Sequence, residues 1–244
     1  MRAVDWWGIK EAILDIIYPI GIRCLICGGR KTDLMPSGEC RECRDSLPFI
    51  APPICPKCGK PVLVQGEVCP DCEHVYHPYR QAMSILEYRR AVPELVHRFK
   101  YQGERILSKP MIEWMSNGVK MNGWDFDIIV PVPLHLRREK KRGFNQAALL
   151  AEGIGRNLGK QVLRHNLIRV IDTHTQANLD KSARMANLQG AFKILVPSQF
   201  KDRDVLLVDD VYTTGATVDE CSRVILGAGA RNVFVLTLAT GRNT

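Results

Sequence analysis

The sequence lacks a long hydrophobic run. No apolar stretch in its 244 residues approaches the roughly 20 residues that a membrane-spanning helix needs. The amino-terminal residues also lack the features of a secretory signal, because Asp5, Glu11 and Asp15 interrupt the apolar residues and no small-residue cleavage site follows. We therefore expect a cytoplasmic protein without a transmembrane segment.

The common nucleotide-binding loops are absent as well. The stretch GIGRNLGKQ (153–161) has the wrong spacing for a P-loop and carries Gln161 where that loop needs Ser or Thr. The stretch GAGARN (227–232) follows a predicted helix instead of a strand, so it ends that helix and does not open a dinucleotide site. Any phosphate site in this chain must therefore be of another kind.

The composition is that of an ordinary globular protein with a basic surplus. Hydrophobic residues make up 45% of the chain, which allows one large domain or one domain with a small module. Lysine and arginine (34) outnumber aspartate and glutamate (26), giving a formal net charge of +8. This balance favours polyanions or anionic small molecules as partners, and a solvated basic surface is the alternative interpretation.

Cysteine shows the clearest pattern in the chain. Eight of the nine cysteines form four C-x-x-C pairs, and Cys221 stands alone. Paired thiols in a chain without an export signal indicate metal sites, not disulfides. The spacings C-x2-C-x12-C-x2-C and C-x2-C-x10-C-x2-C let two pairs fold around one zinc ion, which takes sulfur ligands at about 2.3 Å. We predict two structural zinc sites, with the ligands Cys24, Cys27, Cys40, Cys43, Cys55, Cys58, Cys69 and Cys72.

The grouping of these cysteines is open at the level of sequence. Sequential grouping, with the first four cysteines in one site and the last four in the other, needs the shortest loops. A crossed grouping, first pair with third and second pair with fourth, is the alternative. A redox role for the pairs is disfavoured, because four copies lie outside any βαβ pattern.

Three regions follow one another along the chain. Residues 1–23 contain an amphipathic N-terminal helix, with Trp6 and Ile9 on its apolar face. We expect this face to pack on the body of the protein, and peripheral contact with a membrane or partner is the alternative. Residues 24–78 form the double zinc ribbon, which holds few large apolar residues and can bury little core alone. Residues 79–244 form the main domain.

Buried strands alternate with helices in the main domain. The apolar runs at 126–134, 204–210 and 232–240 predict strands, whereas 145–159 and 217–229 predict helices. Short alternation of strand, helix and strand is typical of a parallel sheet with helices on its faces. The predicted fold class is therefore α/β, a parallel-sheet domain preceded by a small double zinc-ribbon module.

Two adjacent acids end the predicted strand 204–210. Side chains at the carboxyl end of a parallel strand reach the crevice where ligands bind. Burying two acids is costly unless donors or a cation meet them, and the neighbouring hydroxyls of a ribose are suitable donors. The small residues that follow lead into a helix, whose first backbone N–H groups suit a phosphate. These features predict a ribose 5-phosphate pocket formed by Asp209, Asp210, Thr213, Thr214, Gly215, Ala216 and Thr217.

These motifs resemble known families. VLLVDDVYTTGAT (205–217) is similar to the phosphoribosyl pyrophosphate (PRPP) signature of type I phosphoribosyltransferases. FKYQG (99–103), VPVPLHLRREKKRGFNQAALLA (130–151) and THTQANLDKSARMANLQGAF (173–192) resemble stretches of the ComF family, bacterial proteins associated with natural competence and use of external DNA. ComF proteins also carry an amino-terminal zinc ribbon, so the resemblance covers most of the chain.

The resemblance implies a type I phosphoribosyltransferase fold that binds PRPP with Mg²⁺. By this resemblance, Asp209 and Asp210 would meet the ribose hydroxyls, and residues 213–217 would hold the 5-phosphate. The family pattern commonly has a basic residue at the position of Ile171, and Arg169 is the neighbour that could replace it.

Further residues are candidates for the pyrophosphate and for covering the site. Arg137 begins a basic loop at 137–142, just after the predicted strand, and Lys100 is a second candidate cation for the pyrophosphate. Gln176 and Arg184 belong to a stretch that resembles the mobile loop covering such sites and excluding water.

Two functions remain open at this level. The first is a ComF-type phosphoribosyltransferase-like protein, acting in natural competence and DNA uptake, with an acceptor that the sequence does not indicate. The second is a non-catalytic module with a regulatory or vestigial pocket. Such a module would hold single-stranded DNA or a competence ATPase or helicase through the basic loop and the ribbons.

Overall fold

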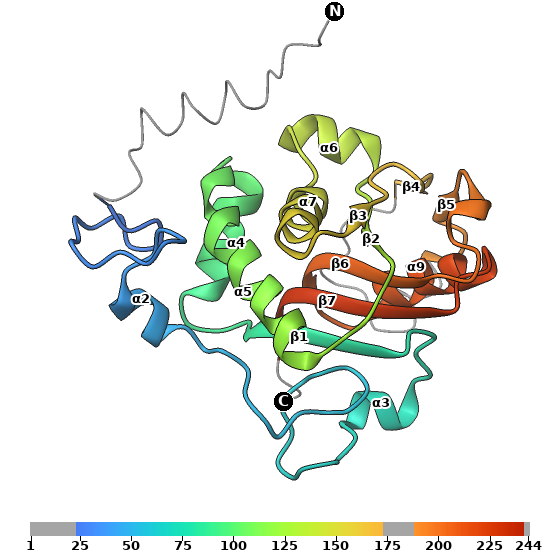
Figure 1. Ribbon diagram of the computed structural model, residues 1–244, viewed down its shortest axis with the longest axis horizontal. Helices are drawn as coiled ribbons and strands as arrows, with labels where there is room; N and C mark the ends of the chain where they lie inside the picture. Colours follow the sequence, from blue (N-terminus) through green and yellow to red (C-terminus); the bar gives the residue numbers. More distant parts are fainter. Residues whose placement is uncertain (1–22, 173–187, 242–244) are drawn as a thin grey trace, which may run out of the picture. The chain divides into compact units, whose positions relative to one another are not determined.

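The computed structural model describes residues 23–172 and 188–241. The chain divides into two compact units, Met1–Leu47 and Pro48–Thr244 (Figure 1). The predicted N-terminal helix lies outside the described residues, as do Gln176 and Arg184. Within the described ranges, no helix combines the length and the apolar composition needed to cross a bilayer.

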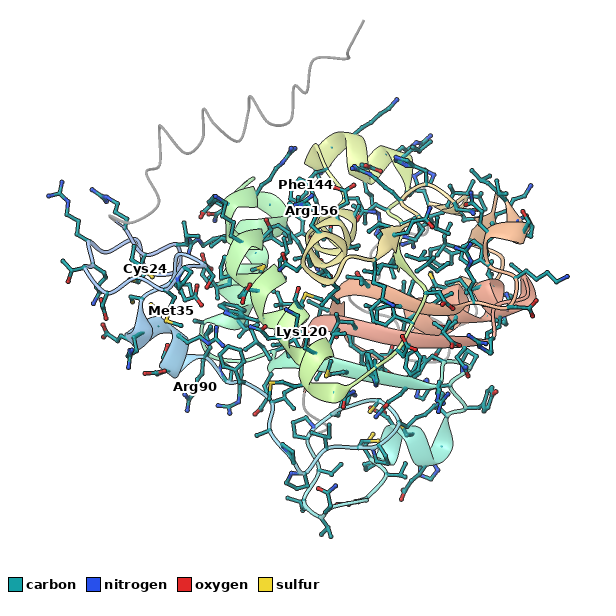
Figure 2. The ribbon with its side chains drawn as sticks, viewed as in Figure 1. Cys24, Met35, Arg90, Lys120, Phe144 and Arg156 are labelled. Atoms are coloured by element: carbon teal, nitrogen blue, oxygen red, sulfur yellow. The ribbon has the colours of Figure 1, made fainter. Side chains whose placement is uncertain are left out.

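The first unit contains the first ribbon. Two antiparallel bridges, Arg23 with Arg30 and Leu34 with Cys40, precede helix α2 (Arg41–Ser46), which has no buried residue. Cys24, labelled in Figure 2, is buried although it belongs to a short loop. A cluster of sulfurs therefore takes the place of a hydrophobic core in the described part of this unit.

The second unit is built on a five-stranded parallel sheet. The strands lie in the order β1-β7-β6-β2-β3, and each pair of neighbours is parallel. Strand β6 lies between β7 and β2 and is apolar over the four consecutive residues 205–208, as expected for a strand covered on both faces. The strands are β1 (Gln81–Glu87), β2 (Ile128–Pro131), β3 (Gln161–Val162), β6 (Asp204–Tyr212) and β7 (Asn232–Thr240).

Helices cover both faces of the sheet. Helix α7 connects β2 to β3, and α9 connects β6 to β7. These two connections run in opposite directions along the sheet. Because such connections are right-handed, α7 and α9 lie on opposite faces. Helix α5 packs against α7 (Figure 1). The helices are α3 (Pro70–His74), α4 (Val92–Tyr101), α5 (Ser108–Asn122), α6 (Leu136–Arg142), α7 (Gln146–Leu158) and α9 (Ala216–Gly227).

Shorter elements complete the unit. Strands β4 (Leu167–Arg169) and β5 (Phe192–Ile194) form a separate antiparallel pair. Two 3₁₀ turns lie at Arg105–Leu107 and Pro197–Gln199.

The predicted α/β fold is confirmed, with changes at some element ends. The final strand has the predicted bounds, and α7 is capped as its sequence indicates, because the Asn145 side chain accepts the Ala148 N–H at 3.3 Å and Gly159 ends the helix in the left-handed region. Strand β2 is shorter than predicted. Strand β6 is longer, since Val211 and Tyr212 continue to pair with β7.

The contact between α5 and α7 requires a glycine. A Cβ at Gly153 of α7 would lie 2.2 Å from Cδ1 and 2.7 Å from Cγ1 of Ile112 on α5. We expect Gly153→Ala to destabilise the protein by about 1–3 kcal/mol, because the branched isoleucine cannot turn away from the new methyl group. The matched control is Gly227→Ala in α9, where no atom lies within 4 Å of the added Cβ. Urea unfolding checks both variants, and equal midpoints for Gly153→Ala and the wild type would contradict this packing.

Candidate functional site

The sheet has a switch point where β2 ends beside β6, and we refer to the region beyond it as the crevice. The pairing of the two strands stops at Pro131 with Val208, and the Val132 N–H donates to the Val208 carbonyl at 2.9 Å. After this point the chain continues from β2 to β3 toward one edge of the sheet, and from β6 to β7 toward the other edge. Such a switch point is where open parallel sheets bind ligands. Asp209 and Asp210 are the first two residues of β6 beyond the end of β2.

Asp210 is paired with a lysine from α4. Its Oδ2 lies 2.9 Å from Nζ of Lys100, and both side chains are largely buried. Burial lowers the pKa of Lys100, but the charge of Asp210 outweighs this effect and raises that pKa above its ordinary value. Lys100 therefore stays charged and balances one of the two adjacent carboxylates.

Asp209 faces the other side of the sheet, because successive side chains of a strand alternate. It is half-buried, and its Oδ1 accepts the backbone N–H of Asp210 at 2.8 Å. Burial and the charge of Asp210 raise the pKa of Asp209 to about 7, against the opposing effects of Lys100 and Arg169. A carboxylate of this kind gains stability when a cation or a hydroxyl donor approaches it.

The turn after β6 presents an uncapped helix start. Gly215 precedes α9 with a φ of +85°, in the left-handed region that favours glycine, and no side chain caps the helix there. Thr213 is exposed and Thr214 is partly exposed beside it. Backbone N–H groups at such a helix start, supplemented by threonine hydroxyls, form a site for an anion.

A cavity of about 310 Å³ lies next to the crevice. It is lined by the segment that follows β2, including Pro133 and His135, and by β4, including Arg169. His135 Nδ1 and Arg138 Nε each lie 3.5 Å from a carboxylate oxygen of Asp172. The cavity therefore combines apolar walls with a small number of cationic or hydrogen-bonding groups, as ligand pockets usually do.

The cysteines form two clusters of four in sequential grouping. In each cluster all four Sγ atoms lie within 4.8 Å of one another, and the crossed grouping is excluded. This spacing fits a zinc ion, since sulfurs at 2.3 Å in a tetrahedron lie about 3.8 Å apart. The first cluster contains Cys24, Cys27, Cys40 and Cys43, and the second contains Cys55, Cys58, Cys69 and Cys72.

Hydrogen bonds from backbone N–H groups lower the pKa of one cysteine in each cluster. Burial raises the pKa of Cys24, but hydrogen bonds from backbone N–H groups outweigh burial and lower that pKa to about 7. The same balance acts on Cys55, whose Sγ accepts the Cys69 N–H at 3.4 Å and whose pKa is also lowered to about 7. Such donors favour the thiolate, which is the form that binds zinc.

Comparison with known proteins identifies the family. Residues 13–73 match the family described as "Double zinc ribbon domain". Competence protein F from Haemophilus influenzae is 30% identical over 223 residues, which cover 89% of this chain and 96% of that protein. Competence protein ComFC from Bacillus subtilis is 34% identical over 208 residues, which cover 82% of each protein. The chain belongs to the ComF family.

Solved structures show a weaker likeness. A purine phosphoribosyltransferase from Pyrococcus horikoshii Ot3 has 16% identity and a TM-score of 0.36, over 54% of this chain and 71% of that chain. Nothing about the ligand of this ComF chain follows from a likeness at this level.

The structure brings several of the predicted site residues of the ComF chain together. Lys100 joins Asp210, and the turn at 213–217 continues directly from the strand that carries both acids. Arg169 lies close enough to influence the charge of Asp209. Arg137 is exposed on α6, and within the described residues no contact joins it to either acid.

The predicted basic loop is a helix. Residues 136–142 form α6 because the His135 side chain accepts the Arg137 N–H at 3.4 Å at its start and Gly143 ends it in the left-handed region. Lys140, Lys141 and Arg142 lie in the last turn, where positive charge favours a helix end. The cations are therefore held in a fixed arrangement after β2.

Sequence reasoning missed one polar cluster beneath the turn. His77 Nδ1 lies 2.9 Å from both carboxylate oxygens of Asp219, and the hydroxyls of Tyr79 and Tyr212 lie 2.9 Å apart. His77 belongs to no motif of the sequence, yet it is buried. No local pattern reveals this pair, because its two residues are 142 positions apart in the sequence.

The raised pKa of Asp209 predicts a pH-dependent stability. The folded protein keeps the Asp209 proton up to about pH 7, whereas the ordinary value is 3.8. The folded state therefore binds more protons between about pH 4 and 7, and the contribution of Asp209 to stability falls as the pH rises through this window, by at most about 1.4 kcal/mol per pH unit. Asp209→Asn mimics the protonated group and removes this loss. We expect the thermal midpoint of Asp209→Asn to exceed that of the wild type by a margin that grows from pH 5 to about pH 7 and then levels off. A margin that is constant from pH 5 to pH 7 would contradict the assignment.

Proposed function

We propose that this ComF-family protein binds PRPP together with Mg²⁺ at the crevice beside β6. The observation that carries the proposal is the continuity of three features: two acids beyond the end of β2, a glycine turn, and an uncapped helix start. Carboxylates accept hydrogen bonds from sugar hydroxyls, and the N–H groups of the turn meet a phosphate. One segment of nine residues, 209–217, can thus bind both ends of a phosphorylated ribose.

Each residue has a distinct task in this proposal. Asp209 accepts hydrogen bonds from the ribose hydroxyls, and residues 213–217 hold the 5-phosphate. Lys100 pairs with Asp210 at 2.9 Å, so a cation from α4 stands beside one of the two acids on the buried strand. The carboxylate and hydroxyl oxygens available here are the ligands that Mg²⁺ prefers, and the ion would neutralise charge on the pyrophosphate.

Transfer of the phosphoribosyl group would require further cations near the pyrophosphate. Arg169 is beside Asp209, and Arg137 lies on α6 after β2. Positive groups there would stabilise the charge that develops on the leaving pyrophosphate. We propose these two arginines for that role, and Gln176 and Arg184 for covering the site.

The cellular role that we propose is in natural competence and DNA uptake, in the cytoplasm. The names of two similar proteins, Competence protein F and Competence protein ComFC, support this role. A second candidate function is favoured by one observation, the exposed cations Arg137, Lys140 and Lys141 on α6. A cationic helix surface of this kind suits the backbone of single-stranded DNA, in a module whose pocket would be regulatory and would hold DNA or a competence ATPase.

Calorimetry with PRPP and Mg²⁺ tests the main proposal. We expect saturable binding by the wild type and at least a tenfold loss of affinity in Asp209→Asn, because an amide cannot replace a carboxylate that accepts two hydroxyl hydrogens. The matched control is Asp202→Asn, at an exposed residue before the amino end of β6, which should bind as the wild type does. A folded wild-type protein that gives no heat at millimolar PRPP would overturn the proposal. Salt-dependent DNA binding that is lost in Arg137→Glu with Lys140→Glu would then favour the second function.

A further inference from the structure

A buried histidine of the second ribbon contacts the helix that follows residues 213–217, which we call the phosphate turn. His77 follows Cys72, the last cysteine of the second cluster, by five residues, and only 1% of its side chain is exposed. Its Nδ1 lies 2.9 Å from both carboxylate oxygens of Asp219, which belongs to the first turn of α9. A residue anchored in the ribbon therefore holds the helix whose start forms the turn.

Two tyrosines continue this contact underneath the glycine. His77 stacks on Tyr79 with ring centroids 5.1 Å apart, and the Tyr79 and Tyr212 hydroxyls lie 2.9 Å apart. Burial raises the pKa of both tyrosines well above the ordinary value, so both hydroxyls remain neutral. A Cβ at Gly215 would lie 2.4 Å from the Tyr212 hydroxyl and 3.2 Å from Cε1 of His77. The turn therefore rests directly on these two rings.

The ribbon itself packs against the same residues. Lys57 Nζ donates to the Tyr79 carbonyl, and the Ala82 N–H donates to the Lys57 carbonyl at 2.8 Å. Lys60 Nζ lies 2.6 Å from Asp71 and 5.7 Å from the centre of the Tyr212 ring. Cys55, Cys58 and Cys69 of the second zinc site belong to one hydrophobic core with residues that flank the turn. These flanking residues are Tyr79, Tyr212, Ala216 and Val218.

An open phosphate site needs such support. The N–H groups of the turn must stay free for the ligand, so no side-chain cap can fix the start of α9. A turn that had to become ordered on binding would lose affinity through the entropy of ordering. The contacts of Tyr212 and His77 with Gly215 fix the backbone of the turn and leave its N–H groups free for a ligand.

We propose that the second zinc ribbon positions the phosphate turn for binding, with His77 as the positioning residue that links them. Zinc at the second cluster fixes the segment from which His77 extends, and His77 fixes Asp219 and the start of α9. The effect on the ligand rests on the proposed binding of PRPP. The mechanical link between ribbon and turn does not, and it can be measured without a ligand.

The test uses the full chain with both zinc ions and three single variants. His77→Leu removes the donor to Asp219. His77→Asn retains an amide N–H at a position similar to Nδ1. His74→Leu is the matched control, because His74 is an exposed histidine of the same ribbon. We expect all three to bind two zinc ions by native mass spectrometry.

The link predicts a specific pattern of hydrogen exchange and affinity. The backbone amides of residues 219–222, which donate hydrogen bonds within the first turns of α9, should exchange at least tenfold faster in His77→Leu than in the wild type. In His77→Asn and His74→Leu they should exchange at near wild-type rates. The affinity for PRPP with Mg²⁺ should follow the same order, with a loss of at least tenfold in His77→Leu only. Wild-type exchange and affinity in His77→Leu would overturn the proposal.

Selective loss of zinc provides a second measurement that does not depend on how His77→Leu folds. In Cys72→Ser the second cluster loses a ligand, and exchange of the hydrogen-bonded amides of residues 219–222 should accelerate. In Cys43→Ser, the equivalent change in the first cluster, exchange there should match the wild type. Equal exchange in these two variants would overturn the link. If the exchange pattern holds and the wild type does not bind PRPP, only the proposed function fails.

Discussion

Asp209 and Asp210 are neighbours on a buried central strand, and their charges must be balanced without filling the crevice beside them. The ion pair of Lys100 with Asp210 meets this constraint on one face of the sheet. Removing one partner of a buried pair typically costs about 3–5 kcal/mol, because the other charge is left without compensation. On the opposite face, no ion pair joins Asp209 to a cation within the described residues, and burial raises the pKa of Asp209. The imbalance leaves one carboxylate available to a ligand.

The two ribbons have the same kind of cysteine cluster but different surroundings. The first lies in its own compact unit, whereas the second shares a unit and a hydrophobic cluster with the sheet. A ribbon cannot bury much core alone, so the second gains stability from Tyr79, Tyr212 and the start of α9. The turn gains a rigid base from the same contacts. Stability of the module and order of the turn are thus two results of one packing arrangement.

The sequence was most informative where the signal is local. Apolar runs predicted the central strands and α7. The paired acids followed by small residues predicted a ribose 5-phosphate pocket, which stays a prediction. The cysteine spacing predicted two metal clusters but left their grouping to the structure, because both groupings satisfy the same spacing. The extension of β6 to Tyr212 was missed because it depends on the length of its neighbour β7.

The contacts that support the site could not be predicted from the chain alone. His77 and Asp219 are joined only by the folding of a ribbon onto a helix start, and neither lies in a motif. The charges of the segment after β2 predict a loop in solvent, whereas the segment is a helix that His135 caps at its start and Gly143 ends. Long-range packing and end effects of this kind carry no periodic signal in a sequence.

A crystal structure of the protein soaked with PRPP and Mg²⁺ tests the central claim most directly. We expect the 5-phosphate against the backbone N–H groups of residues 213–217 and the ribose hydroxyls at Asp209, with the ion pair of Lys100 and Asp210 still formed. Ligand density at any other place, or at this place with the sugar turned away from Asp209, would contradict the account.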